Sequence, residues 1–365
     1  MKNEIRLIAE CSYEEESGRW ISGGNLNGLF YYDKTMDKLQ LIDQFPEEKL
    51  LGFRLFKDIN KYMDKLVFAP CYANSAYIYD INKKKFDVLS IPESSNKGNK
   101  YMKTVAHGNK IYLFPYSCKD LLVINVEEGF VETCSAWSNL EEKYGIKTPD
   151  NICIDIQEYG NLVFVVTNDK NLICVDINTE EIKVIDISKA IKDDILSFDI
   201  ADGGKSIWIL TNNKKIIQYS MCNEQIENEY ILEEAYTKLL ATCEYLYLFD
   251  VKYGHLSVIK TESGMQTIYK SKANVDNDLL VNAPHIYGFY DIKKRRDIVY
   301  YFDFLNSGYY GIKGDSISTV YKSIFVDFDI FADNFLKKEK NIMLNELDAK
   351  LLFGMNVEGF FRAIL

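Results

Sequence analysis

The sequence predicts an all-β fold built from a repeated unit, and three observations support this prediction. Tyr (26) and Phe (21) are abundant whereas Pro (6) is rare, a composition that suits half-buried strands. Short apolar runs that end in a polar residue recur at intervals of 40 to 53 residues, and further strand-like runs surround each of them. Four short strands in a repeat of this length form the unit of a β-propeller, so we expect seven four-stranded antiparallel blades.

The repeat is most regular at the polar residue that closes the third strand of each unit, which we call the marker. The marker runs are GLFYYD (Asp33), AYIYD (Asp80), LLVIN (Asn125), LICVD (Asp176), IIQYS (Ser220), LSVIK (Lys260) and YYGIK (Lys313). An Asp or Asn side chain can accept hydrogen bonds from backbone N–H groups two residues further on, so the marker is interpreted as a turn-forming residue. Because weak copies are easily miscounted, six or eight blades stay open as alternatives.

The other three strands of each unit follow in the same order along the chain. First strands are expected in the runs IRLIAECSY, GFRLF, MKTVAH, ICIDIQ, ILSFDI, KLLATC and HIYGFYDI. Second strands are expected at 19–22, 65–70, 110–115, 162–166, 206–210, 245–249 and 298–302. A fourth strand follows the marker, as in KFDVLSI, EIKVIDI, QIENEYI and SISTVY. Each unit is therefore predicted to be a meander whose strands are joined by tight polar turns.

Two segments carry a resemblance to known propeller repeats. VFVVTNDKNLICVDINTEEIKVI resembles a repeat of the YVTN type. ILSFDIADGGKSIWILTNNKKIIQYS resembles a WD-repeat blade that lacks the Gly-His and Trp-Asp dipeptides. The resemblance extends over roughly residues 5 to 323 and implies a propeller of the WD-repeat/YVTN-like superfamily. It implies nothing specific about function, because unrelated functions share this fold.

The chain beyond the seventh unit has a different pattern, so we divide it into a propeller (1–323) and a helical C-terminal tail (324–365) packed on the propeller. Leu347, Leu351 and Leu352 have helical spacing, and Gly354 is placed to end that helix. A second short helix is expected from Val357 to Leu365. A partner-binding or dimerisation role for these helices is the alternative to simple packing.

Charge and composition exclude several classes of function. The formal net charge is −11 and the pI is near 5.0, which disfavours nucleic acid as a partner. We see neither an apolar run long enough to span a bilayer nor a signal-like N-terminal segment, so we expect no membrane association. The eight cysteines form no CxxC pair and are expected to be free thiols in the cytoplasm.

Sequence motifs of catalysis and of cofactor binding are missing. The chain contains no GxGxxG, GxxxxGK[ST], GxSxG or HExxH motif, and we expect no cofactor. It has only three histidines, so no metal site is predicted. The basic run KKRR (293–296) is interpreted as a solvated turn between the first two strands of the seventh unit.

The candidate site lies where the first strands of a propeller surround the axial channel. Polar residues within these otherwise apolar strands are the informative ones, and they either pair with one another or bind a ligand. They are Glu10, Arg54, Lys103, His107, Asp155, Asp199, Lys238 and His285. The longest links between blades are 92–100, 135–151 and 270–284, and binding sites tend to lie on such loops. Near these links, Tyr72, Tyr116, Trp137 and Tyr144 are candidates for exposed rings that contact a sugar or a peptide side chain.

These features favour a non-catalytic scaffold that recognises a peptide, a partner protein, or a small polar or carbohydrate ligand at the loop-rich face. The alternative is an enzyme acting at the channel mouth, a lyase, hydrolase or cyclotransferase. Asp155 in ICIDI and Asp199 in SFDI are expected at matching places in adjacent blades, where they could act as acid and base.

Overall fold

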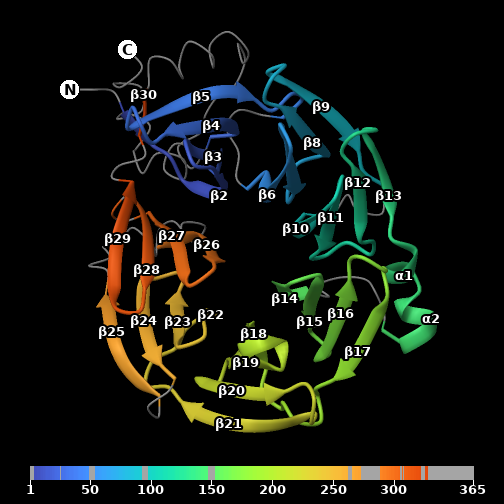
Figure 1. Cartoon of the computed structure of the whole chain (residues 1–365), viewed down its shortest axis with the longest axis vertical. Coiled ribbons are helices and arrows are strands. Elements are labelled where there is room, and N and C mark those ends of the chain that lie inside the picture. The colour runs from blue at the N-terminus through green and yellow to red at the C-terminus, as the bar shows by residue number, and fades with distance from the viewer. Residues whose placement is uncertain are drawn as a thin grey trace.

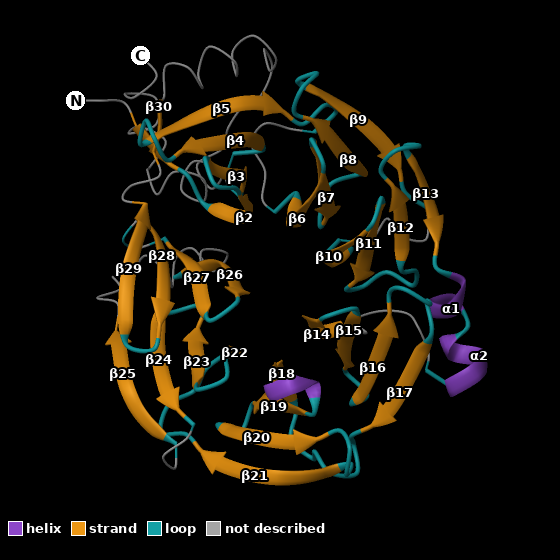
Figure 2. Cartoon of the chain, in the orientation of Figure 1, coloured by secondary structure: helices purple, strands orange, loops and turns teal. Residues whose placement is uncertain are grey.

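The computed structural model describes residues 4–24, 26–48, 54–92, 98–146, 153–261, 265–272, 288–304, 306, 308–321 and 325–327. In this part of the chain, seven four-stranded antiparallel sheets stand as blades in a ring around a central channel (Figure 1). Helices α1 (Ser135–Ser138) and α2 (Leu140–Tyr144) lie on the outside, between the third and fourth blades (Figure 2). No described helix has the length and apolar character needed to cross a membrane. The predicted all-β, seven-bladed fold is therefore confirmed.

Each blade consists of four consecutive strands, the first of which lies next to the channel (Figure 1). The first strands are β2 (Ala9–Glu14), β6 (Phe56–Tyr62), β10 (Tyr101–His107), β14 (Cys153–Tyr159), β18 (Ile195–Ala201), β22 (Lys238–Ala241) and β26 (Phe289–Arg295). The second strands are β3 (Gly18–Gly23), β7 (Lys65–Pro70), β11 (Lys110–Pro115), β15 (Leu162–Thr167), β19 (Ser206–Thr211), β23 (Tyr245–Asp250) and β27 (Ile298–Asp303).

The third and fourth strands complete each blade towards the rim. The third strands are β4 (Gly28–Asp33), β8 (Ser75–Asp80), β12 (Leu122–Asn125), β16 (Asn171–Asp176), β20 (Lys215–Ser220), β24 (His255–Lys260) and β28 (Gly308–Lys313). The fourth strands are β5 (Lys38–Gln44), β9 (Lys85–Ser90), β13 (Phe130–Thr133), β17 (Ile182–Asp186), β21 (Gln225–Ile231), β25 (Gln266–Lys272) and β29 (Ser316–Tyr321). Blades are numbered 1 to 7 in this chain order.

The markers form turns, as predicted. Asp33 Oδ1 accepts hydrogen bonds from the N–H groups of Thr35 (2.8 Å) and Met36 (3.0 Å). Asp80, Asn125, Asp176 and Ser220 accept equivalent bonds from backbone N–H groups two or three residues further on. These bonds shape the turn from the third to the fourth strand, at the end of the blade opposite the loops that precede the first strands.

The ring closes without exchange of a strand between blades 1 and 7, because all four strands of each blade are consecutive in the chain. A separate two-stranded antiparallel sheet joins β1 (Glu4–Arg6) to β30 (Phe325–Asp327), beside β5 of blade 1 (Figure 1). The predicted C-terminal helices lie outside the described residues, and the three residues described beyond 323 form this strand.

The core consists of apolar clusters that each join two neighbouring blades. Between blades 1 and 2, Phe45 packs against Phe56 and Phe68, with ring centroids 4.4 and 5.0 Å away. Similar clusters join blades 2 and 3, 3 and 4, 4 and 5, 5 and 6, and 6 and 7. Because the apolar faces of the blades are buried against one another, the inner edges of the first strands carry polar side chains.

One predicted strand is misplaced. GFRLF (52–56) was expected as the first strand of blade 2, but β6 begins at Phe56 and continues through KDINKY to Tyr62. The polar residues of this run broke the apolar pattern because they lie along the channel. The shift brings Lys57 and Asp58 into the site.

Candidate functional site in the channel

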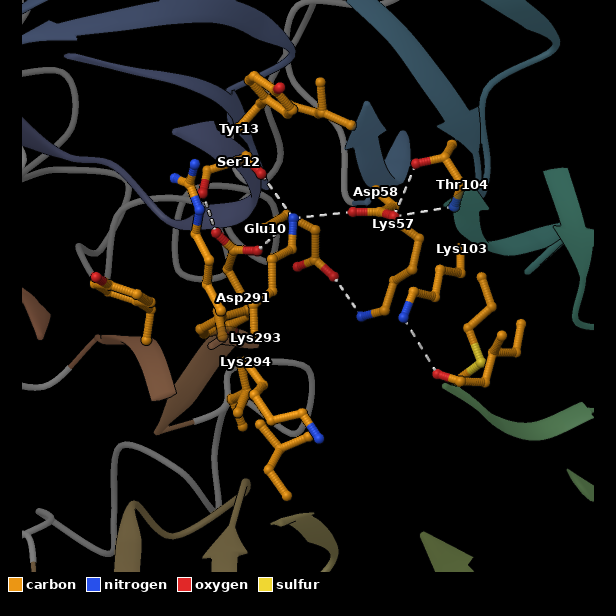
Figure 3. Close-up of a pocket in the computed structure, with 18 of the residues that line it drawn as sticks. Glu10, Ser12, Tyr13, Lys57, Asp58, Lys103, Thr104, Asp291, Lys293 and Lys294 are labelled. Atoms are coloured by element: carbon orange, nitrogen blue, oxygen red, sulfur yellow. Dashed lines mark hydrogen bonds and ion pairs between the residues drawn. The ribbon is translucent and has the colours of Figure 1, made fainter. Parts of the chain in front are cut away.

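A cavity of about 710 Å³ occupies the channel and is lined by residues of the first strands (Figure 3). Eight Lys and Arg residues line it, against six Asp and Glu residues. The lining therefore has a cationic excess although the whole chain carries a net charge of −11. The cavity has the size of a small-molecule or peptide-segment site.

A one-residue bulge near the start of the first strand recurs in blades 1 to 5. The unpaired residues lie between Ala9 and Cys11, Phe56 and Asp58, Tyr101 and Lys103, Cys153 and Asp155, and Ile195 and Ser197. A bulge re-aims side chains and increases the local twist. Glu10 and Lys57 are themselves bulge residues, and Asp58, Lys103 and Asp155 follow a bulge directly, so this irregularity directs charged side chains to the cavity.

Two carboxylates in these positions each connect a blade to the next one. Asp58 Oδ2 accepts hydrogen bonds from the backbone N–H (2.9 Å) and the hydroxyl (2.9 Å) of Thr104 in blade 3. Asp155 Oδ2 accepts bonds from the hydroxyl of Ser197 (2.6 Å) and the N–H of Phe198 (3.3 Å) in blade 5. Hydrogen bonds to a charged acceptor contribute more than neutral ones, so these contacts hold the inner strands in register.

Three ion pairs join blades that are not neighbours in the ring. They are Lys238 of blade 6 with Asp155 of blade 4 (2.6 Å), Lys293 of blade 7 with Asp58 of blade 2 (2.9 Å), and Lys294 of blade 7 with Asp199 of blade 5. Each skips one blade, and the carboxylate side chains are at most 12% exposed. These lysines therefore bridge across the channel wall.

Where blades 7 and 1 meet at the channel, their side chains form a polar network. Asp291 accepts hydrogen bonds from the hydroxyls of Ser12 and Tyr309. Arg19 donates to Ser12 Oγ (2.8 Å), and its guanidinium lies 4.0 Å from the centroid of the Tyr309 ring. Lys293 donates to the carbonyl of Ser12 (2.6 Å) and pairs with Asp291 (3.1 Å). Figure 3 shows Ser12, Asp291 and Lys293 converging at this seam.

Electrostatics keeps the paired groups charged. Burial alone would raise the pKa of Asp58, but Lys293 and the bonds from Thr104 outweigh it and hold that pKa below its ordinary value. Burial alone would lower the pKa of Lys293, but Asp291 and Asp58 outweigh it and raise that pKa. Both groups are therefore ionised at neutral pH.

The structure brings most of the predicted channel residues together. Arg54, Lys103, Asp155 and Lys238 line the cavity, as does Glu10.

His107 and Tyr116 are not among the lining residues, and both are half-buried. His107 ends β10, and the N–H of Tyr116 donates to the carbonyl of Lys100 (2.8 Å). His285 lies outside the described residues.

The prediction of exposed aromatic rings holds for some residues and is wrong for Trp137. Trp137 is completely buried in the cluster between blades 3 and 4, and its indole N–H donates to the carbonyl of Lys119 (3.1 Å). It anchors α1 instead of offering a binding surface. Tyr72 is 47% exposed and Tyr144 is 37% exposed, although the Tyr144 hydroxyl donates to the carbonyl of Ile182.

Asp155 and Asp199 do not hold matching places. Asp155 directly follows its bulge and pairs with Val166, whereas Asp199 lies two residues beyond Ser197, the equivalent of Asp155. Two residues along a strand amount to about 7 Å. Asp199 accepts the N–H of Ala241 (2.7 Å) and pairs with a lysine, as Asp155 does. Both carboxylates serve as structural anions, which removes the basis for an acid/base pair.

The interpretation of 293–296 as a solvated turn is wrong for Lys293 and Lys294, whereas Arg296 does lie in the turn between β26 and β27. β26 extends to Arg295, so Lys293 and Lys294 lie within a first strand. A two-residue irregularity after Tyr290 includes Asp291, whose φ is +44°, and places both lysines at the channel. Sequence reasoning therefore missed these lysines together with Lys57 and Asp58. Alignment of each first strand on its hairpin partner could have indicated them.

All eight cysteines are free thiols. In the described ranges, no group of three or more His, Cys, Asp or Glu residues could hold a metal ion. Burial raises the pKa of Cys11, which lies beside the channel and donates to the carbonyl of Phe56. This thiol is therefore protonated and packs as a small apolar group.

Fold and channel together define a β-propeller protein, and comparison with known proteins agrees. The family model described as the NUP159/214 beta propeller matches residues 68–270, more than half of the chain. The chain belongs to this family of propellers. The predicted resemblance to the propeller superfamily is thus confirmed at the level of the fold. A search of curated proteins found no match.

Solved structures give the same result. A chain from the crystal structure of the mitotic checkpoint complex superposes with a TM-score of 0.53 at 9% identity, covering 84% of each chain. Hsv2 of Kluyveromyces lactis gives 0.51 at 10% identity, covering 83% of this chain and 92% of that one. BamB of Moraxella catarrhalis gives 0.51 at 8% identity, covering 81% of each. At such identities the similarity concerns the fold alone.

Proposed function

We propose that the protein is a non-catalytic binding propeller that recognises a partner protein, a peptide segment or a small polar ligand at the channel mouth on its loop-rich face. The loop-rich face is the end of the ring formed by the loops before the first strands and between the second and third strands. The observation that carries this proposal is a cavity of about 710 Å³ whose charged lining is fixed by ion pairs. A pre-organised polar cavity suits recognition, because little side-chain entropy is lost on binding.

The same ion pairs argue against the enzymatic alternative. A general acid or base must be able to change its protonation state near the working pH. Asp155 is bound by both oxygens to Lys238 at 2.7 and 2.6 Å, and Asp199 is bound to Lys294. Removal of such a carboxylate charge would break a contact between blades.

The loop-rich face carries an exposed contact that suits a partner. Tyr72 follows β7, is 47% exposed, and donates its N–H to the carbonyl of Arg54 (3.2 Å), a cavity-lining residue. Tyrosine offers a large contact area at a small entropic cost. We further propose a cytoplasmic location, because all eight cysteines are free thiols.

The proposal can be tested by site-specific photo-cross-linking in the cells of origin. A photoreactive phenylalanine analogue replaces Tyr72 in one variant and Met63 in the control variant. Met63 is 71% exposed in the turn between β6 and β7, at the opposite end of the same blade. We expect a discrete cross-linked partner from position 72 only, which then binds the purified protein. Equal cross-linking from both positions, or from position 63 alone, would contradict binding at the loop-rich face.

A further inference from the structure

Six of the eight cations that line the cavity fall into two groups with different partners. Lys238, Lys293 and Lys294 each contact at least two oxygen atoms, and each has a buried carboxylate as an ion-pair partner. These three are structural bridges between blades. Arg54, Lys57 and Lys103 form the second group, which we call the mouth cations. They come from blades 2 and 3 and from the loop before β6.

The carboxylate partners of the mouth cations are shared or exposed, unlike those of the bridges. Arg54 and Lys57 share one atom, Glu10 Oε1, at 3.8 and 2.9 Å. The carboxylate partner of Lys103 is Glu158 (3.0 Å), whose side chain is 40% exposed. The Lys57 side chain is itself 38% exposed. Lys57 thus shares its carboxylate partner with Arg54, and Lys103 pairs with a solvated one.

The mouth cations lie on adjacent strands that approach closely. Lys57 and Lys103 each precede a residue of the inter-blade contact in which Thr104 donates to Asp58 (2.9 Å). Figure 3 shows the ammonium groups of both lysines directed into the pocket from β6 and β10. Arg54 is fixed in the preceding loop at φ +55°, and its N–H bonds to the carbonyl of Gly24 (3.4 Å). The three cations are therefore held in place before any ligand arrives.

We propose that Arg54, Lys57 and Lys103 form a subsite for carboxylate groups, and that the ligand of the proposed binding function is rich in acidic groups. This inference rests on the proposed function and names the class of its ligand. A ligand carboxylate would make an additional contact with the Lys57 ammonium group and would displace the exposed Glu158 from Lys103. Glu158 then returns to water, which costs little because it is already 40% exposed.

Carboxylate chemistry fits these positions better than phosphate chemistry. The mouth cations already bind carboxylates of this chain, so a ligand carboxylate repeats an existing contact. A phosphate monoester carries close to two charges and three strong acceptor oxygens, so its transfer from water needs more donors. Acidic side chains of a peptide and free di- or tricarboxylic acids share the required chemistry.

Lys57 and Lys103 carry their positive charges whether or not a ligand is bound. Partial burial alone would lower the pKa of Lys57 and of Lys103, but Glu10 and Glu158 respectively outweigh it and raise both pKa values. Both lysines thus stay cationic across the physiological range. Because the whole chain carries a charge of −11, an acidic ligand has no general attraction to its surface. Binding of such a ligand would therefore report the local site.

The experiment measures fluorescence anisotropy with a labelled peptide of alternating Glu and Asp residues, and uses citrate and pyrophosphate as competitors. We expect salt-sensitive binding that weakens about tenfold in Lys103→Met, the loss of one charge-assisted contact. Lys103 is chosen because its carboxylate partner, Glu158, is solvated, so its replacement should destabilise the fold least. The matched control is Lys61→Met, since Lys61 lies in the same strand as Lys57, also pairs with a glutamate (Glu15), and does not line the cavity.

Competition by citrate at millimolar concentration would indicate a free acid as the source of the carboxylates, and resistance to citrate with binding of the peptide would indicate a peptide. Either result supports the carboxylate subsite. Stronger competition by pyrophosphate than by citrate, equal weakening by Lys61→Met, or binding of neither carboxylate probe would overturn it. If the subsite fails in this way while Tyr72 still cross-links a partner, the proposed function stands and only the ligand class is wrong.

Discussion

Replacement of Lys293 by methionine should destabilise the contact between blades 7 and 1. The Lys293 ammonium contacts Asp58 (2.9 Å), Asp291 (3.1 Å) and the carbonyl of Ser12 (2.6 Å), so it joins blades 7, 1 and 2. Methionine keeps the length of the side chain and removes its charge. Two carboxylates, with side chains 12% and 0% exposed, would then lose the cation that they share.

The expected loss follows from burial and residual contacts. Breaking a buried ion pair by removing one partner costs about 3–5 kcal/mol. The Lys293 side chain is 35% exposed, so water replaces part of its contribution. Asp58 also keeps its two bonds from Thr104. We therefore expect a loss of about 2–3 kcal/mol in the free energy of unfolding, at or just below the lower limit of the range for buried pairs.

Urea denaturation and limited proteolysis measure this effect. The matched control is Lys313→Met, because Lys313 pairs with Asp297 at 3.7 Å in the same blade with both side chains at least 60% exposed. That substitution should change the free energy of unfolding by less than about 0.5 kcal/mol. In the double variant Lys293→Met, Asp291→Asn, part of the loss should be recovered because one buried charge is removed. If Lys293→Met costs no more than Lys313→Met, the network does not close the ring.

Three further predictions follow from single contacts. Asp58 has a folded pKa below its unfolded value, so its contribution is present above about pH 4 and is lost as the pH falls through the folded pKa; the melting temperature of Asp58→Asn should accordingly fall less than that of the wild type between pH 5 and pH 2. Trp137→Ala should lower the free energy of unfolding by about 3–5 kcal/mol in urea titrations, because the side chain is fully buried; a loss under about 1 kcal/mol would contradict its anchoring role. Asp176→Ala should cost about 0.5–1.5 kcal/mol through loss of its bond from Asn178 (2.8 Å), whereas alanine at the marker Lys313, whose side chain is 64% exposed, should cost less than about 0.5 kcal/mol; equal losses would show that the marker side chain does not shape the turn.

The repeat was predictable because it is local. A third strand that ends at Asp176 and a turn that this side chain closes with Asn178 involve residues adjacent in the chain. The apolar second strands are also buried on both faces, so their pattern is continuous and strong. Blade number and strand order follow from repetition of this unit, without any knowledge of contacts between blades.

The channel was less predictable because its geometry depends on bulges. A single unpaired residue shifts every following side chain by one position, and composition does not reveal where it lies. Asp155 and Asp199 were therefore aligned by their similar apolar surroundings, although they stand two positions apart in register. Lys293 and Lys294 were taken for a turn because a basic run is usually solvated, whereas their carboxylate partners lie in distant parts of the chain.

Ring closure and ligand recognition draw on the same set of channel charges. No strand is exchanged between blades 7 and 1, so side chains such as Asp291 and Lys293 help to hold that seam at the channel, in addition to the β1–β30 sheet. Blades 2 and 3 are consecutive in the chain and share an apolar cluster, and Asp58 joins their first strands through its bonds from Thr104. Lys57 and Lys103 can therefore keep exposed or shared partners without loss of the fold. The structural cations thus have buried carboxylates of other blades as partners, whereas the proposed binding cations share a carboxylate or pair with an exposed one.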